Sequence, residues 1–261
     1  QAQAFLQFVP EPNFNQGPFN FQSPGSRALS TQDSYLGRLD HNFVSSNLLT
    51  ARYVWNETVE SGLPFWGNDE RNNSARAGNL LLQYTRTLSP SRTNQLRFGW
   101  NRLSDQERFG TTGRPDFDVA GLMGIPRVSR RTSDSGPPSI TITGPDGTTD
   151  VFQLQRASGP RDRVSNALQL SNVYSWKRGA HMLRFGGDWI RKYHGLWQAQ
   201  NPRGTFTFDG SYTGSALADF LLGYVRSASI APSPTAANLR STWQSYYAQD
   251  DWRVSHTLTL N

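Results

Sequence analysis

The strongest pattern in this chain is an alternation of apolar and polar residues from 166 to 193, broken by four turn-forming residues at 177–180. Within each half, one parity carries the larger apolar and aromatic residues and one histidine, namely Leu168, Leu170, Tyr174, Trp176, His181, Leu183, Phe185, Trp189 and Tyr193. The other parity carries Gln169, Ser171, Ser175, Arg184, Asp188 and Lys192. A repeat of two is the repeat of a β-strand, so the stretch predicts a long β-hairpin with one apolar and one polar face.

The same plan recurs along the chain. Two similar pairs of alternating runs come earlier, at 35–56 and 80–101, and a weaker run from 243 to 254 is followed by the start of another strand at 258–261. The predicted hairpin turns are short and lie at 44–47, 89–92, 177–180 and 253–256. The connections between hairpins are long and lie at 59–74, 106–162 and 195–238. This pattern predicts seven full strands, the start of an eighth, and an irregular connecting segment over residues 1–32 before them.

The length of the runs and the order of the connections favour a membrane barrel. Each run of the 166–193 hairpin has about a dozen residues, whereas strands of soluble proteins have about five or six. A strand that crosses a membrane needs about 9 to 11 residues, with apolar side chains outward and polar side chains toward the lumen. Short turns at one end and long loops at the other are typical of outer-membrane barrels. The predicted fold class is therefore all-β, an antiparallel up-and-down transmembrane β-barrel segment of about eight strands from a larger barrel.

Composition agrees with this prediction and excludes other classes. Aromatic residues make up 12% of the 261 residues although only 36% are hydrophobic, and aromatic rings are favoured at membrane boundaries. No run of about 18 apolar residues is present, so the sequence predicts no transmembrane helix. The net charge of +6 comes from dispersed arginines that alternate with aromatic residues, which argues against nucleic acid as a partner. The absence of cysteine excludes thiolate metal sites and disulfides.

The long connections contain short elements of their own. Residues 139–143 and 151–155 flank a turn and predict a small hairpin, and residues 205–208 predict a short strand. From 215 to 224, apolar residues at positions i, i+3 and i+4 and a glycine at 223 predict one short loop helix. The segment 144–150 has oxygen-bearing residues but lacks the ligand spacing of a calcium loop, so we expect it to be the tip of the small hairpin.

Several blocks of the sequence resemble one family. The blocks DSYLGRLDHNF (33–43), TRTLSPSRTNQLRFGWNR (85–102), WKRGAHMLRFGGDW (176–189), ALADFLLG (216–223) and YYAQDDWRVSHTLTLN (246–261) are similar, in their order and spacing, to strand-and-turn blocks of TonB-dependent outer-membrane receptors. They are most similar to the Oar-like branch, whose members carry an N-terminal carboxypeptidase-regulatory-like domain. The resemblance covers most of residues 33–261 and is weakest in the long loops.

The resemblance implies a barrel of about twenty-two strands with a plug in its lumen, energised by the inner-membrane TonB complex. Members of the family import siderophores, cobalamin, glycans or peptides, and some Oar-like members are associated with export. This sequence lacks the plug, the TonB box and most of the strands. We therefore expect part of the outer-membrane barrel of a Gram-negative receptor that is not functional alone. Its partners would be outer-membrane lipid, the plug, the remaining strands and, through the plug, the TonB complex.

The candidate site residues form two sets. Arginine and carboxylate side chains on the polar parity would be costly against lipid, so we expect them to face the lumen and to pair in ladders between strands. They are Arg38, Asp40, Arg52, Arg97, Arg184 and Asp188. Aromatic residues in predicted extracellular loops could stack on a ring-bearing ligand, although packing of loop against loop is the simpler role, and they are Phe65, Trp66 and Trp197.

No catalytic or metal-binding pattern is present, so the sequence predicts neither an enzyme nor a cofactor. The four histidines are scattered and match no metal motif. Asp250 and Asp251 are adjacent, so their side chains would point to opposite faces of a strand and could not act together as acid and base. We expect Asp250 to pair with an arginine in the barrel wall.

Two alternatives make different structural predictions. A stand-alone barrel of about eight strands, acting as an adhesin or anchor, requires the first strand to pair with the last. A secreted glycan-binding β-sandwich requires the aromatic faces to be buried between two sheets. A segment of a larger barrel instead predicts open sheet edges, with Leu96, Phe98, Trp100, Leu183 and Phe185 exposed toward lipid.

Overall fold

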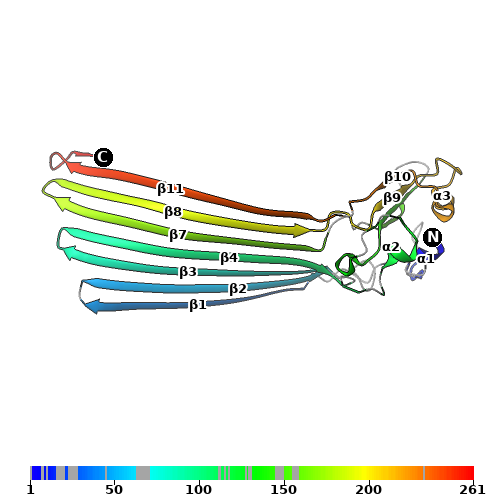
Figure 1. Cartoon of the computed structure of the whole chain (residues 1–261), viewed down its shortest axis with the longest axis horizontal. Helices are drawn as coiled ribbons and strands as arrows, with labels where there is room; N and C mark the ends of the chain where they lie inside the picture. Colours follow the sequence, from blue (N-terminus) through cyan, green and yellow to red (C-terminus); the bar gives the residue numbers. More distant parts are fainter. Residues whose placement is uncertain are drawn as a thin grey trace.

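The computed structural model describes residues 2–6, 9, 11–15, 21–22, 29–44, 46–62, 71–110, 113–114, 116, 118–126, 128, 131–144, 150–154, 159–231 and 233–261. Its main body is a long antiparallel sheet with the strand order β1-β2-β3-β4-β7-β8-β11-β12 (Figure 1). The strands are β1 (Leu29–Val44), β2 (Asn47–Gly62), β3 (Arg71–Ser89), β4 (Arg92–Phe109), β7 (Arg161–Arg178), β8 (His181–Gln198), β11 (Thr235–Arg253) and β12 (Thr259–Leu260). Seven are long and the eighth has two residues, which confirms the predicted strand count.

The two ends of this sheet differ. At one end, the turn end, short connections join β1 to β2, β3 to β4 and β7 to β8, and the last two close through the residue pairs 90–91 and 179–180. At the other end lie all the long connections and a second, smaller body (Figure 1). The predicted arrangement of short and long connections is therefore confirmed.

Strand boundaries at this far end differ from the prediction. The predicted loops at 59–74, 106–162 and 195–238 are shorter in the structure, because β2 continues to Gly62, β3 begins at Arg71, β4 reaches Phe109, β7 begins at Arg161, β8 reaches Gln198 and β11 begins at Thr235. The first strand likewise begins at Leu29, inside the segment 1–32 that was predicted to be irregular. Backbone hydrogen bonds between strands do not require an apolar face, so the ladder continues where the side-chain alternation has already ended.

The smaller body, which we call the cap, contains a four-stranded sheet and three helices. Its sheet has the order β10-β9-β5-β6, with β5 (Ser139–Thr143), β6 (Asp150–Leu154), β9 (Thr205–Phe208) and β10 (Ser227–Ser229). Its helices are α1 (Ala2–Leu6), α2 (Val119–Leu122) and α3 (Ala216–Leu222), with a short 3-10 helix η2 (Thr132–Asp134). The predicted hairpin, short strand and loop helix are all present, whereas the parallel pairing of β5 with β9 and the helix α1 were not predicted.

The ends of α3 follow from its sequence. The Ser215 side chain accepts a hydrogen bond from the Ala218 amide at 3.4 Å and so caps the first turn. Gly223 ends the helix in the left-handed conformation at φ 80°, which a residue without a side chain adopts easily.

The buried apolar core lies entirely outside the long strands. Phe5, Ile140, Phe208 and Phe220 belong to one buried cluster in the cap, where Phe220 contacts Phe5 and Phe208 edge to face at centroid distances of 5.8 and 5.2 Å. Within the described residues, no apolar side chain of the seven long strands is buried. Nothing in the part of the chain that the structure describes therefore covers the apolar side chains of the main sheet, and they need another apolar medium.

Strand register places the predicted faces correctly. Leu82, Phe98, Leu170 and Trp189 are register partners across β3, β4, β7 and β8, and they lie on what we call the apolar face. The residues that alternate with them along each strand point to the opposite side of the sheet, which we call the polar face. Leu96, Phe98, Trp100, Leu183 and Phe185 all share the apolar face. Leu96 and Phe185 remain 41% and 43% exposed.

The height of the apolar face fits a membrane. On β3 the apolar stretch lies between Arg76 and Arg86, and on β4 between Arg92 and Arg102, each pair ten positions apart. A tilted strand crosses the hydrocarbon in about 9 to 11 residues, so these arginines stand at its two boundaries.

Both alternative folds are contradicted. A sandwich would bury Phe98 and Phe185 between two sheets, but they are exposed. A closed eight-stranded barrel would pair β1 with the last strand, but β1 and β12 are the two edges of an open sheet. No helix in the described part of the chain is both long and apolar enough to cross a membrane.

Candidate functional site

A belt of polar side chains crosses the polar face at mid-height. Its members are register partners on seven successive strands, and they are Asp40, Thr50, Gln83, Arg97, Ser171, Asp188 and Ser245. The six residues predicted to face the lumen, Arg38, Asp40, Arg52, Arg97, Arg184 and Asp188, all lie on this polar face. Three of them belong to the belt itself.

Hydrogen bonds within the belt are partly different from the predicted arginine–carboxylate ladders. Asp40 accepts from the Arg38 Nε at 2.7 Å, but Arg38 lies on the same strand β1, and the cross-strand partner of Asp40 is the Thr50 hydroxyl at 2.6 Å. Arg184 on β8 pairs with the Asp251 carboxylate on the neighbouring strand β11 at 3.4 Å, as a ladder predicts.

The remaining pairs involve neutral groups. Arg97 donates to the Gln83 side-chain oxygen at 2.9 Å, and Asp188 accepts from Gln169 at 3.2 Å and from the Ser171 hydroxyl. The register explains this difference, since it places Gln83 opposite Arg97 and Ser171 opposite Asp188.

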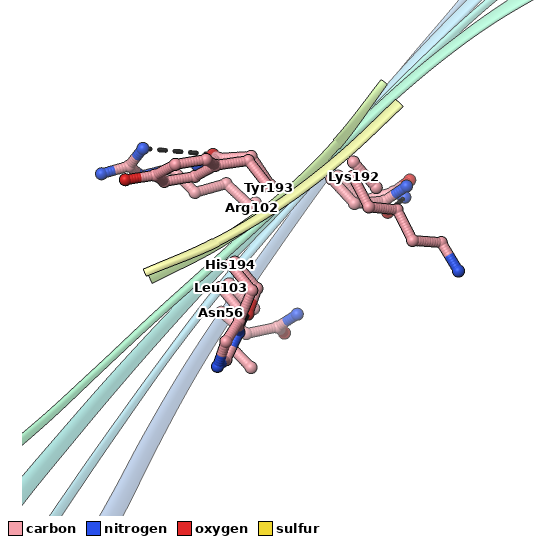
Figure 2. A pocket seen from close by; sticks show the side chains of 13 residues that line it. Asn56, Arg102, Leu103, Lys192, Tyr193 and His194 are labelled. Carbon is pink, nitrogen blue, oxygen red and sulfur yellow. Dashed lines mark hydrogen bonds between the residues drawn. The ribbon is translucent and has the colours of Figure 1, made fainter. Parts of the chain in front are cut away.

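Between the belt and the cap, the polar face holds a depression of about 500 Å³ that spans β2, β3, β4, β7 and β8. Small residues such as Ala77, Ala167 and Ser165 leave the space open. Figure 2 shows Asn56, Leu103, Lys192 and His194 on this side of the sheet, whereas Arg102 and Tyr193 stand on the apolar side.

Amide groups dominate the polar lining of the depression. The Asn79 side-chain nitrogen donates to the side-chain oxygen of Asn101, and the side-chain oxygen of Asn79 is buried without a hydrogen-bond partner. His194 shares a hydrogen bond of 2.7 Å with the Ser165 hydroxyl. A surface of this kind can bind uncharged polar groups such as backbone amides or hydroxyls.

An ion-pair cluster lies on the polar face at its cap end, between β3, β4 and β7. The Glu107 carboxylate is 5% exposed and lies 2.6 Å from Arg71 and 3.8 Å from Arg161. Asp105 lies 3.2 Å from Arg161 and 3.5 Å from Arg163. Two cations neutralise each carboxylate, which offsets the cost of removing Glu107 from water.

Sequence reasoning missed this cluster because Arg71, Glu107 and Arg161 fell inside the predicted loops 59–74 and 106–162, and Asp105 and Arg163 lay directly at their borders. A signal was present, since Asp105 and Glu107 share one parity, as do Arg161 and Arg163, with opposite charge.

Asp250 has a different partner from the one predicted. The carboxylate accepts a hydrogen bond at 2.7 Å from Nδ1 of His181 and not from an arginine. The register of β8 and β11 explains this partner, because it places Trp252 opposite His181, and Asp250 lies two residues from Trp252 on the same face. The His181 ring stacks on Trp252 at a centroid distance of 5.4 Å, at the turn end of the sheet. The predicted separation of the two aspartates onto opposite faces is confirmed, since Asp251 bonds Arg184 on the polar face.

The loop aromatics remain a prediction. Phe65 and Trp66 lie outside the described residues. Trp197 lies within β8 and not in a loop, on the parity of the apolar face. Its half-buried ring belongs to the wall of the sheet near the cap.

The cap is held by buried polar groups. Asp219 is fully buried and accepts hydrogen bonds from the Thr213 amide at 2.9 Å and the Thr213 hydroxyl at 2.7 Å. Arg203 donates to the Asp134 carbonyl oxygen at 3.0 Å. Burial lowers the pKa of Arg203 to about 10, and the negative charge of Asp134 opposes that change. Across the described residues, no group of three or more His, Asp or Glu side chains could hold a metal ion.

These observations define a class: an open, membrane-height antiparallel sheet with an apolar outer face, a polar inner face and a cap at the long-loop end. The chain belongs to the outer membrane beta barrel domain family, whose model matches residues 1–261. It is accordingly an outer-membrane protein.

A solved structure has the same fold. The outer membrane transporter YddB from Escherichia coli superposes with a TM-score of 0.50 over 87% of this chain, at 11% sequence identity. This chain covers 26% of that transporter's chain, about a quarter of its length. A comparison with curated protein sequences finds no match. In barrels of this kind the short turns face the periplasm and the long loops face outside, which places the cap outside the cell.

Proposed function

We propose that this chain forms part of the wall of a TonB-dependent transporter of the Oar-like branch, and that it contributes to substrate uptake across the outer membrane. The role is transport and not catalysis. The resemblance of the strand-and-turn blocks to that branch and the likeness to a larger transporter barrel support the proposal. The open edges of the sheet support a wall section that is completed by further strands.

The depression on the polar face is the observation that carries the proposal. A lumen filled only with water would not need a recess lined by small side chains and amides, such as Ala77, Ala167, Asn79 and Asn101. We propose that a plug in the lumen fills this recess and bonds the amides through its backbone. The buried Asn79 oxygen would then gain a donor.

A photo-crosslinking experiment tests the plug contact. A photoreactive amino acid replaces Leu103 in the recess of the full-length protein, and irradiation of intact outer membranes follows. We expect an intramolecular crosslink to a segment outside the barrel, identified by mass spectrometry. The matched control carries the same group at Arg102, one residue away on the apolar face (Figure 2), where we expect crosslinks to lipid. Equal crosslinking of the plug from both positions would contradict the proposal.

An uptake experiment tests the energy source. Cells with and without the full-length gene, and with and without TonB, receive a panel of siderophores, cobalamin, glycans and peptides. We expect at least one compound to be taken up only when both the gene and TonB are present. Gene-dependent uptake that persists without TonB would refute the assignment to a TonB-dependent transporter.

A further inference from the structure

The apolar face becomes polar at one height near the cap. Arg102, Asn166, Tyr193 and Arg240 are register partners on β4, β7, β8 and β11. One register row closer to the turn end, Trp100 on β4 and Leu168 on β7 are apolar, while Arg191 on β8 and Thr242 on β11 complete that row. Because the cap faces outside the cell, the row of Arg102 marks the outer boundary of the hydrocarbon, at the level of the outer-leaflet headgroups.

Three arginines gather at this boundary. Arg102 and Arg240 belong to the row itself, and Arg191 lies two positions from Tyr193 on β8, opposite Thr242 of β11. All three side chains are exposed. Adjacent strands lie about 4.8 Å apart, so Arg191 and Arg240 are neighbours and Arg102 lies about 10 Å away, two strands from β8.

Neutral groups hold the three guanidinium groups without cancelling their charge. Arg102 donates to the Asn166 side-chain oxygen at 3.1 Å, and Arg191 donates to the Thr242 hydroxyl at 3.2 Å. Arg240 lies over the Tyr193 ring at 5.8 Å. Over the ranges that the structure describes, none of the three forms an ion pair with a carboxylate.

Arg76 offers a direct contrast. It lies on the same face of β3 and near the same height, since its neighbour Gly78 pairs with Arg102. The Arg76 Nε donates to the Glu57 carboxylate at 2.6 Å, which neutralises its charge. The three unpaired arginines are therefore not a general property of this boundary.

We propose that Arg102, Arg191 and Arg240 form a binding site for a phosphorylated glycolipid of the outer leaflet. A guanidinium has five donors in a planar fork that matches phosphate oxygens, and each of these arginines uses only part of its fork. Arg191 and Arg240 bind one phosphate, and Arg102 binds a second phosphate of the same headgroup about 10 Å away. The site depends on the membrane location of the chain and not on its transport role.

Lipid retention tests this site. The full-length protein is purified from outer membranes in mild detergent, and bound lipopolysaccharide is measured by native mass spectrometry. Each arginine near an anionic lipid surface increases the affinity roughly fivefold. We therefore expect the triple variant R102Q/R191Q/R240Q to bind lipopolysaccharide on the order of a hundredfold more weakly than the unchanged protein. R76Q is the matched control, and we expect it to retain lipopolysaccharide as the unchanged protein does.

Two further arms identify the ligand. If the site binds the phosphate groups, lipopolysaccharide without its phosphates should compete poorly with the bound lipid. If the site requires a headgroup that is anchored in the membrane, free inorganic phosphate at millimolar concentration should not displace the lipid. Unchanged retention in the triple variant, equal loss in R76Q, or displacement by inorganic phosphate alone overturns the proposal. If the triple variant does not assemble, the single variant R240Q must still show about a fivefold loss.

Discussion

A charge placed on the apolar face gives the sharpest test of the membrane assignment. Leu170 lies on β7 between Phe98 and Trp189, and its side chain is 45% exposed. In the variant Leu170→Arg the new guanidinium would meet no carboxylate in those two register positions. The nearest polar side chains on this face of β7 and β8 are Asn172, two residues along β7, and Arg191, opposite Leu168; the first is neutral and the second is positive, so neither would neutralise the new charge.

The expected loss follows from that position. Arginine near the middle of a bilayer costs a transmembrane barrel about 2–4 kcal/mol, a factor of roughly thirty to several hundred in the folding equilibrium. Gln169→Arg is the matched control, one residue away on the polar face. Gln169 already donates to Asp188 at 3.2 Å, so an arginine there gains a carboxylate and should change stability by less than about 0.5 kcal/mol.

The assay is reversible unfolding of the full-length protein in urea with phosphatidylcholine vesicles, followed by tryptophan fluorescence. We expect a large shift of the unfolding midpoint for Leu170→Arg and almost none for Gln169→Arg. If the two variants unfold together, or if Gln169→Arg is the less stable one, lipid does not cover the apolar face and the membrane argument fails.

The cap allows three further predictions, each measured by hydrogen–deuterium exchange of its backbone amides. Asp134→Asn removes the charge that balances buried Arg203, and we expect a local loss of about 3–5 kcal/mol with faster exchange near η2; unchanged exchange would show that the charge is balanced elsewhere. Phe220→Ala opens a cavity in the buried cluster and should cost about 3–5 kcal/mol, with α1 exchanging faster; protection of α1 as before would contradict that packing. Hydrogen bonds from Ser211 lower the pKa of Asp209. The stabilisation that these hydrogen bonds give the folded cap is therefore present above the ordinary pKa of an aspartate and is lost as the pH falls through the lowered pKa of Asp209. Ser211→Ala should raise this pKa and move the acid-induced loosening of the 209–214 turn to higher pH, whereas an identical pH profile in the variant would exclude the interaction.

The alternation of side chains predicted the parts of the fold that depend on local pattern. Each parity in the hairpin at 166–193 maps onto one face of the sheet, because successive side chains of a strand point to opposite sides. The helix at α3 was also predictable, since its apolar spacing, the Ser215 cap and Gly223 are all local signals.

Polar strand ends were not predictable from alternation. Beyond the hydrocarbon both faces of β2 and β3 carry polar residues, so the pattern disappears while the backbone ladder continues to Gly62 and from Arg71. The ion pairs of Glu107 with Arg71 and Arg161 lie in that region and were missed with it.

The sequence by itself therefore determined which residues share the apolar face and which share the polar face, because that choice depends only on the parity of each residue in its own strand. Only the tertiary structure decided which side chains meet. His181 reaches Asp250 across 69 residues of chain, and Phe5 packs on Phe220 in the cap. Such partners depend on the register between strands and on how loops distant in sequence pack together, and no local pattern contains that information.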